Sequence, residues 1–221
     1  MTTFLISFVI VILVCIFWTW NMLGNHPKLK SELYDNLSFK TGDIILFHAY
    51  DNINPVFIGS YWGHIGVVYN DIDDDNPPLL FEAARTSSMK YCPEYNKSGI
   101  MITDLKTRLE KYPGLIACKF LKTPIDDDKI RNFKDFMKYA KTNMYYHDNV
   151  IESGINKLFG EKLHNGTNCG EITTLSLIKL GLLNKSVLDK NICHHLKYTA
   201  NIKNVNDNEY SNPIELLFNR F

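Results

Sequence analysis

Four short hydrophobic runs in the middle of the chain have the length and composition of β-strands. They are rich in β-branched and aromatic residues, and turn signals such as Thr41-Gly42-Asp43 bound them. The runs are IILFHAY, GHIGVVYN, PLLFEAA and GLIACKFLK, at residues 44–50, 63–70, 78–84 and 114–122. Because they follow one another at hairpin-like spacing and do not alternate with helices, they predict an antiparallel sheet.

The hydrophobic period becomes helical in two later segments. After Asp126–Asp128, which can cap and charge a helix start, apolar residues recur at helical spacing at Ile130, Phe133, Phe136, Met137 and Ala140. The second segment is residues 169–180, with Ile172, Leu175 and Ile178 as its expected buried stripe and Gly181 as a left-handed cap. Strands followed by packed helices predict an α+β fold.

The first segment of the chain is of another kind. Residues 4–20 (FLISFVIVILVCIFWTW) contain no charge, and a helix of about 17 to 25 such residues can cross a bilayer. A cleaved signal peptide would need a positively charged start and a small-residue cleavage site, neither of which is visible. We therefore expect a transmembrane anchor at 1–24, a polar tether at 25–37 and a globular domain at 38–221.

The flanking charges predict how the chain sits on the membrane. Residues 4–23 would contact the lipid bilayer, and Lys28, Lys30 and Lys40 follow this segment while no lysine or arginine precedes it. By the positive-inside tendency, the chain is expected to be a single-pass membrane protein with its domain in the cytosol. Five scattered cysteines form no evident disulfide framework, which also favours a reducing compartment.

Composition narrows the class of protein further. A chain of 221 residues that is 45% hydrophobic can bury one substantial core. Its 24 Lys and Arg residues equal its 24 Asp and Glu residues, so no overall positive charge favours nucleic-acid binding.

Cys169 and His64 are the first candidates for chemistry. With Asn168 or Thr167 as N-cap, the Cys169 sulfur lies in the first turn of a helix, where the positive end of the dipole favours a thiolate. His64 begins a predicted strand and could share the proton of such a thiol. The alternatives are a buried structural cysteine and a structural histidine of the core.

Glu82 could complete this pair from the next strand. Strand alternation places His64, Gly66 and Val68 on one face, and a hairpin can bring Glu82 beside His64 to orient its ring. Gly66 would leave room on that face for a substrate. Glu82 could equally be an edge residue, and His48 is a weaker candidate base because it faces the other way.

An ordered set of motifs carries a family resemblance. GDIILF, HIGVV, FEAA and NCGEITTLSLIKLGLL, followed by YSNPIELL, resemble the circularly permuted papain-like hydrolases of the NlpC superfamily, which includes YiiX-like bacterial proteins, a poxvirus branch and lecithin:retinol acyltransferase-like enzymes. The resemblance implies a permuted papain-like domain with His64 as base, Glu82 as its partner and Cys169 as nucleophile. It further suggests Tyr146 and Asn168 as oxyanion or cleft residues.

The resulting functional prediction is a membrane-anchored cysteine hydrolase or acyltransferase with a Cys-His-Glu triad. Its substrate would be a small acyl, lipid or peptide compound, cleaved at an amide or ester bond without a cofactor. A zinc site at Cys193-His194-His195 is a weaker reading, because no second ligand pair lies at suitable spacing. The alternative function is a non-catalytic papain-like binding module or a membrane scaffold.

Overall fold

The computed structural model has a mixed α+β fold and describes residues 12, 29–48, 62–84, 98–146, 166–184 and 210–218. Tyr146 and Gly166 are described by their backbone only. The strands are β1 Lys30–Leu33, β2 Ile44–His48, β3 His64–Tyr69, β4 Leu79–Ala84, β5 Gly99–Asp104, β6 Leu115–Lys119, β7 Tyr145–Tyr146, β8 Gly166–Thr167 and β9 Ile214–Leu217. The helices are the 3-10 turn η1 Tyr34–Asn36, α3 Leu105–Glu110, α4 Asp127–Asn143 and α6 Cys169–Lys179.

Seven strands form one sheet in the order β1-β9-β6-β2-β3-β4-β5, and β7 pairs with β8 in a separate two-stranded sheet. All neighbours from β9 to β5 are antiparallel, which confirms the predicted antiparallel sheet. The pairs β1-β9 and β7-β8 are parallel. The four predicted strands are observed as β2, β3, β4 and β6.

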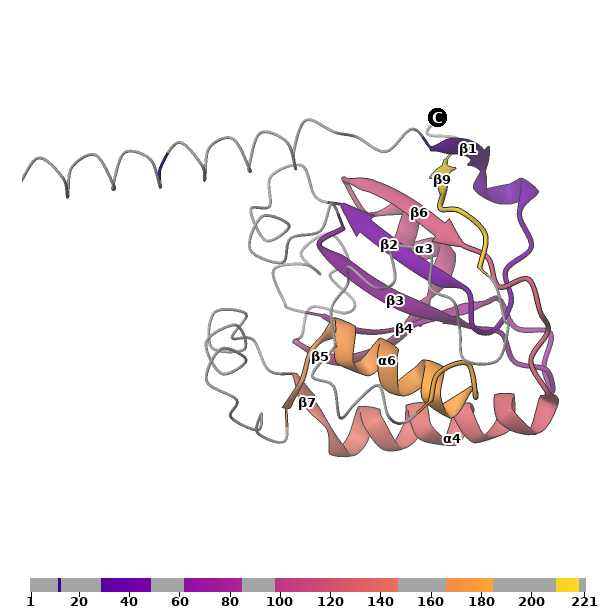
Figure 1. The fold of residues 1–221 in the computed structure, drawn as a ribbon, viewed down its shortest axis with the longest axis vertical. Helices are drawn as coiled ribbons and strands as arrows, with labels where there is room; N and C mark the ends of the chain where they lie inside the picture. The colour runs from indigo at the N-terminus through magenta and orange to yellow at the C-terminus, as the bar shows by residue number, and fades with distance from the viewer. Residues whose placement is uncertain are drawn as a thin grey trace, which may run out of the picture.

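Both faces of the sheet are covered. Helices α4 and α6 lie side by side on one face of the sheet (Figure 1). Ile44, Leu46 and Val67 belong to the same hydrophobic cluster as the buried residues of these two helices. The opposite face carries Ile45 and Phe47 and packs against α3. Burial on both faces explains why β2 is continuously hydrophobic instead of alternating.

Helix α4 has the predicted start and buried stripe. The side chain of Asp126 accepts a hydrogen bond from the Asp128 N–H at 3.0 Å, so Asp126 is the N-cap. Ile130, Phe133, Met137 and Ala140 are buried along one side, while Phe136 is half-buried, as expected for an amphipathic helix.

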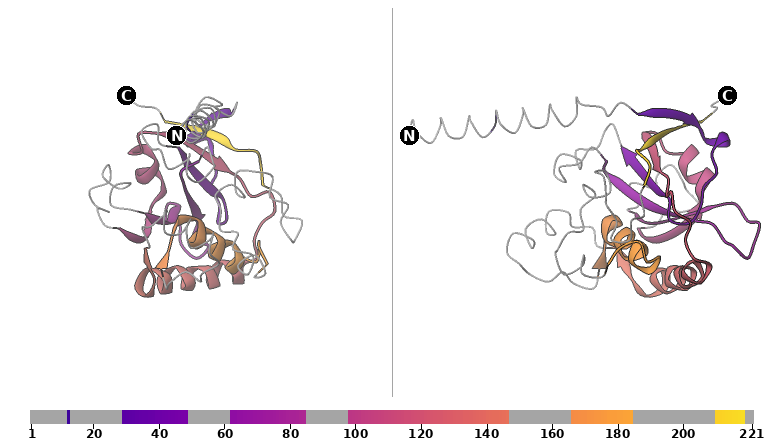
Figure 2. Two further views of the ribbon diagram at one scale, coloured as in Figure 1. Left: turned by 60° about the vertical axis from the view of Figure 1, so that its left-hand side comes forward. Right: turned by 45° about the vertical axis from the view of Figure 1, so that its right-hand side comes forward.

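Helix α6 differs from the prediction in how much of it is buried. Leu175 and Ile178 are only half-buried, whereas Thr174 and Ser176 are buried. The reason is that α6 packs against β3, β4 and α4, so more than one of its sides is covered (Figure 2). The hydroxyls of Thr174 and Ser176 are satisfied within the helix, because they donate to the carbonyls four residues earlier at 2.8 and 2.7 Å.

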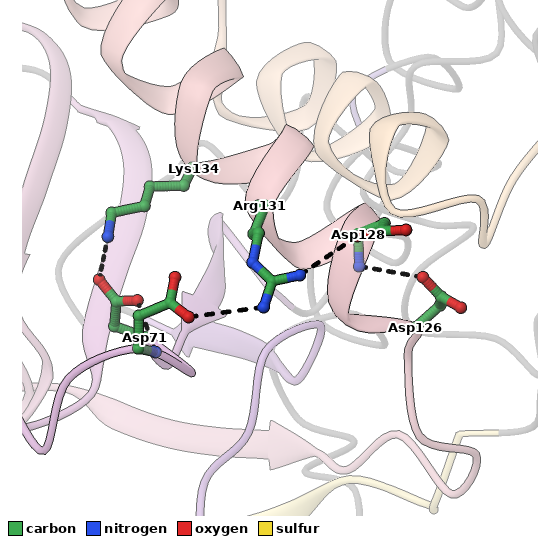
Figure 3. Close-up of polar contacts among 6 residues, drawn as sticks. Asp71, Asp126, Asp128, Arg131 and Lys134 are labelled. Carbon is green, nitrogen blue, oxygen red and sulfur yellow. Dashed lines mark hydrogen bonds and ion pairs between the residues drawn. The ribbon is translucent and has the colours of Figure 1, made fainter.

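The loop between β3 and β4 is fastened to α4 by ion pairs (Figure 3). Lys134 contacts Asp71 at 2.5 Å, and Arg131 contacts Asp73 at 3.5 Å and Asp128 at 3.2 Å. Asp128 therefore acts as a first-turn charge, as predicted. Arg131 is half exposed, and solvent screening weakens ion pairs of this kind.

The region expected to be a tether requires a correction. Within residues 25–37, residues 30–33 form β1 and pair in parallel with β9, and residues 34–36 form η1. The Tyr34 ring stacks on Phe39 at 4.9 Å and on Phe218 at 5.2 Å, and the Ser31 hydroxyl donates to Glu215 at 2.7 Å. This stretch is folded because its apolar and hydroxyl side chains find partners on the sheet.

The expected anchor at residues 4–23 lies outside the described residues except for Ile12. In the part of the chain that the structure describes, no helix is both long and apolar enough to span a bilayer.

Candidate catalytic site

The start of α6 holds Cys169 in place. Asn168 is the N-cap, and its side chain accepts from the N–H groups of Gly170 at 2.9 Å and Glu171 at 3.1 Å. The Glu171 carboxylate accepts in return from the Asn168 N–H at 3.1 Å, which completes a capping box. Of the two N-cap candidates, Asn168 and Thr167, the structure has Asn168, and Cys169 occupies the first helical turn at the positive end of the dipole.

The register of β3 and β4 places His64 and Glu82 on one face. Val67 pairs with Phe81, so Glu82 falls opposite Gly66, diagonally adjacent to His64. The His64 Nε2 and Glu82 Oε2 atoms are 2.5 Å apart. The Glu82 side chain is fully buried and the His64 side chain is 14% exposed, so this contact is largely shielded from water.

His64 also reaches the cysteine. Burial alone would lower the pKa of His64, but hydrogen bonding and charge attraction from Cys169, followed by those from Glu82, outweigh it and raise this pKa to about 9. The structure therefore brings Cys169, His64 and Glu82 together in one cluster.

Arg108 of α3 is a member of this cluster that the sequence analysis missed. Its Nε donates to Glu82 Oε1 at 2.7 Å and its second guanidinium nitrogen donates to Oε2 at 3.3 Å. Burial would raise the pKa of Glu82, but the charge of Arg108 and then the contact with His64 outweigh it and lower this pKa to about 2. The carboxylate is ionised throughout the neutral range.

Aromatic rings pack around the two cationic side chains. The Phe47 ring lies 5.2 Å from the His64 ring and 4.8 Å from the Arg108 guanidinium. Tyr112 packs against Phe47 at 4.9 Å and lies under the same guanidinium at 5.6 Å. These ring contacts restrict the orientations of the His64 imidazole and the Arg108 guanidinium.

Of two expectations for the surroundings of His64, the one about Gly66 is wrong and the one about His48 agrees with the structure. The room predicted beside Gly66 is filled, because Leu80 Cδ1 lies 2.9 Å from the position that a Cβ of residue 66 would take. Gly66 thus allows close packing of β4 and does not open a substrate space. His48 is buried and alternates away from Phe47, the residue that contacts His64.

The residues suggested for the oxyanion are placed only in part. Asn168 serves as the helix cap, and the Gly170 and Glu171 N–H groups both donate to it, so these two donors are committed. The backbone of Tyr146 lies in β7 opposite Thr167 of β8. The side chain of Tyr146 lies outside what is described.

No group of three or more potential metal ligands occurs among the described residues, and Cys193-His194-His195 lies outside them. Within the same described set, Cys118 offers a contrast to Cys169. It lies in strand β6 and is fully buried, and burial together with the charge of Asp43 raises the pKa of its thiol. A buried thiol of this kind is unreactive.

The arrangement can support nucleophilic chemistry at sulfur. A thiol at a helix start, hydrogen-bonded to an imidazole that a buried carboxylate orients, has the components of an activated cysteine. The alternating signs of Arg108, Glu82 and an imidazolium at His64 would stabilise a thiolate at Cys169.

Comparisons with known proteins give a limited result. No protein-family model matches the sequence, and no curated protein matches it. Among solved structures, the fold is similar to the crystal structure of the metalloprotein YiiX from Escherichia coli O157:H7, with 16% identity and a TM-score of 0.41. The match covers 62% of this chain and 64% of that chain, so it spans less than two thirds of the YiiX structure. A likeness at this level does not assign an activity to this chain.

Proposed function

We propose that this protein is a thiol hydrolase or acyltransferase with a permuted papain-like arrangement. Cys169 is the nucleophile, His64 the general base and acid, and Glu82 the residue that orients His64. The observation that carries the proposal is the position of His64, whose Nε2 lies 2.5 Å from Glu82 Oε2 and whose pKa is raised by hydrogen bonding and charge attraction from Cys169 at the start of α6.

The reaction follows from these three side chains. The Cys169 thiolate attacks a carbonyl carbon, and a carbon–sulfur bond forms while the carbonyl electron pair moves to oxygen. His64 then gives its proton to the departing nitrogen or oxygen, which leaves a thioester on Cys169. Water or another acceptor loses a proton to His64 as it attacks the thioester, and the thiolate is released. The oxyanion needs donors other than the committed Gly170 and Glu171 N–H groups.

The substrate class is inferred from the N-terminal segment. With residues 4–23 as an anchor and the domain in the cytosol, the site would work beside a lipid surface, which favours amide or ester bonds of lipids, lipidated proteins or peptides. Extraction of full-length protein with alkaline carbonate tests the anchor, because a bilayer-spanning helix stays with the membrane. Release into the supernatant would contradict this part of the proposal.

The test of the chemistry uses iodoacetamide and p-nitrophenyl acetate as probes on the full-length chain in detergent. Cys169 should alkylate with an apparent pKa below the usual thiol value of about 8.5, while buried Cys118 serves as the internal reference. Cys169→Ala and His64→Ala should each reduce ester turnover by about a thousandfold, and combining them should add little.

Two outcomes would contradict the proposal. One is alkylation of Cys169 like an ordinary thiol with a profile that His64→Ala leaves unchanged, which would make His64 a structural residue. The other is an activated Cys169 with no ester turnover, which would favour a binding module that keeps a papain-like site.

A further inference from the structure

We infer that Arg108 is a positioning residue of this site: it holds Glu82 ionised and in line with His64, and through Glu82 it sets the reactivity of Cys169. This inference rests on the proposed function and adds a fourth member to the three-residue unit. Arg108 comes from α3, an element that supplies no other residue to that unit.

The contacts of Arg108 are directed at Glu82. The guanidinium donates two hydrogen bonds to the carboxylate, at 2.7 and 3.3 Å. This two-point contact fixes the orientation of the Glu82 carboxylate relative to Arg108. The residue is only 1% exposed, which rules out a role in solubility. The Phe47 and Tyr112 rings lie 4.8 and 5.6 Å from the guanidinium carbon and pack beside it. Burying a guanidinium is costly, and its pairing with Glu82 offsets that cost.

The groups around Glu82 show why its charge depends on Arg108. From α3 it meets Arg108, from β3 it meets His64, and its β5 partner is the uncharged Met101. Cys169 of α6 acts on Glu82 through His64. Without Arg108, a carboxyl in this dry setting would favour its protonated form at mildly acidic pH. A protonated Glu82 would no longer stabilise the imidazolium, and the thiolate of Cys169 would then form only at higher pH.

The same geometry predicts that removing Arg108 has the opposite effect on the reactivity of Cys169 once Glu82 has been replaced. In a Glu82→Gln background, Arg108 becomes a buried cation without a carboxylate, next to an imidazole that must also become cationic. Removing the guanidinium should then help the thiolate form. A residue that merely supported the fold would lower reactivity in both backgrounds.

The experiment measures the rate of Cys169 alkylation by iodoacetamide against pH in the full-length chain, by mass spectrometry of the peptide that carries residue 169. The variants are Arg108→Met, Arg108→Lys, Glu82→Gln and the Glu82→Gln/Arg108→Met pair. Arg131→Met is the control. Arg131 is a half-exposed arginine of α4, and its ion-pair partners, Asp73 and Asp128, do not belong to this cluster.

Arg108→Met should move the acid limb of the profile up by about one pH unit, which is about a tenfold lower rate at mildly acidic pH. Arg108→Lys keeps the charge and should stay close to wild type at that limb. In the Glu82→Gln background, Arg108→Met should raise the rate severalfold. Arg131→Met should change nothing.

The inference is overturned if Arg108→Met leaves the profile of a well-folded protein unmoved, or if it lowers the rate equally in both backgrounds. If Arg108→Met does not fold, the charge-balanced double variant decides, and a double variant no faster than Glu82→Gln alone overturns the inference. An ordinary thiol profile in the wild type would instead defeat the proposed function. The two failures are therefore distinguishable.

Discussion

At the scale of single residues, Asp43 gives a prediction about stability that is separate from the candidate site. Asp43 is fully buried, and its carboxylate accepts hydrogen bonds from the Leu121 N–H at 2.8 Å and the Lys40 N–H at 2.9 Å. Asp43→Ala would leave both donors without this acceptor. We expect it to lower the free energy of unfolding by about 2–4 kcal/mol in chemical denaturation.

The pH dependence of this effect has a definite sign. Burial raises the pKa of Asp43 to about 6 in spite of its hydrogen bonds and the charge of Lys40, so folding disfavours the ionised form. A raised pKa means that the contribution of Asp43 is greatest below the unfolded value of 3.8 and falls as the pH rises through about 6. The penalty of Asp43→Ala should therefore be larger at about pH 5 than at neutral pH. The exposed Asp75→Ala is the control, and an equal effect of both changes would refute the argument.

The residues of the site show what a sequence can and cannot indicate. Cys169 was predictable because a helix-start pattern surrounds it, and Glu82 because strand alternation and a hairpin limit which face it occupies. Arg108 was not, because no local pattern marks an arginine in a short helix as buried. Its partner lies 26 positions away in sequence, and the pairing arises only when α3 folds against the sheet.

At the scale of elements, the cap of α6 couples stability to reactivity. Asn168 accepts from two N–H groups, so Asn168→Ala should cost about 1 kcal/mol of unfolding free energy. Asn168→Asp keeps the acceptor and the stability but adds a negative charge beside Cys169. That charge should disfavour the thiolate and move the acid limb of Cys169 alkylation to higher pH.

Thermal unfolding and alkylation profiles of both variants separate the two effects. The control is Thr142→Ala at the exposed end of α4, which should change neither measurement appreciably. A profile that Asn168→Asp leaves unchanged would show that the field at the start of α6 does not act on Cys169.

The elements themselves were predicted unevenly, for physical reasons. Strands β2, β3, β4 and β6 stood out because they are buried on both faces or nearly so and carry dense apolar runs. Strand β5 was not predicted, since Gly99–Asp104 is only partly buried at the edge of the sheet and carries polar residues among its apolar ones. Strand β1 was missed because its four residues, KSEL, are mostly polar and depend on β9, which follows almost two hundred positions later.

At the scale of the whole molecule, the pairing of β1 with β9 changes where the folded unit begins. Strand β9 contacts β6 on one side and β1 on the other, so removing β1 would turn β9 into an edge strand. The Tyr34 ring, which stacks between Phe39 and Phe218, would be lost with it. An exposed strand edge beside uncovered aromatic rings favours aggregation.

We therefore expect a fragment of residues 29–221 to fold better than a fragment that starts at Ser38, the boundary that the sequence alone suggested. The longer fragment should unfold cooperatively, and the shorter one should aggregate or melt at least about 5 °C lower, since about 1 kcal/mol corresponds to about 2–4 °C in a domain of this size. Thermal unfolding followed by circular dichroism and by light scattering measures both properties. Equal melting temperatures would mean that β1 packs on the sheet without stabilising it, and the folded unit would then begin at Ser38 after all.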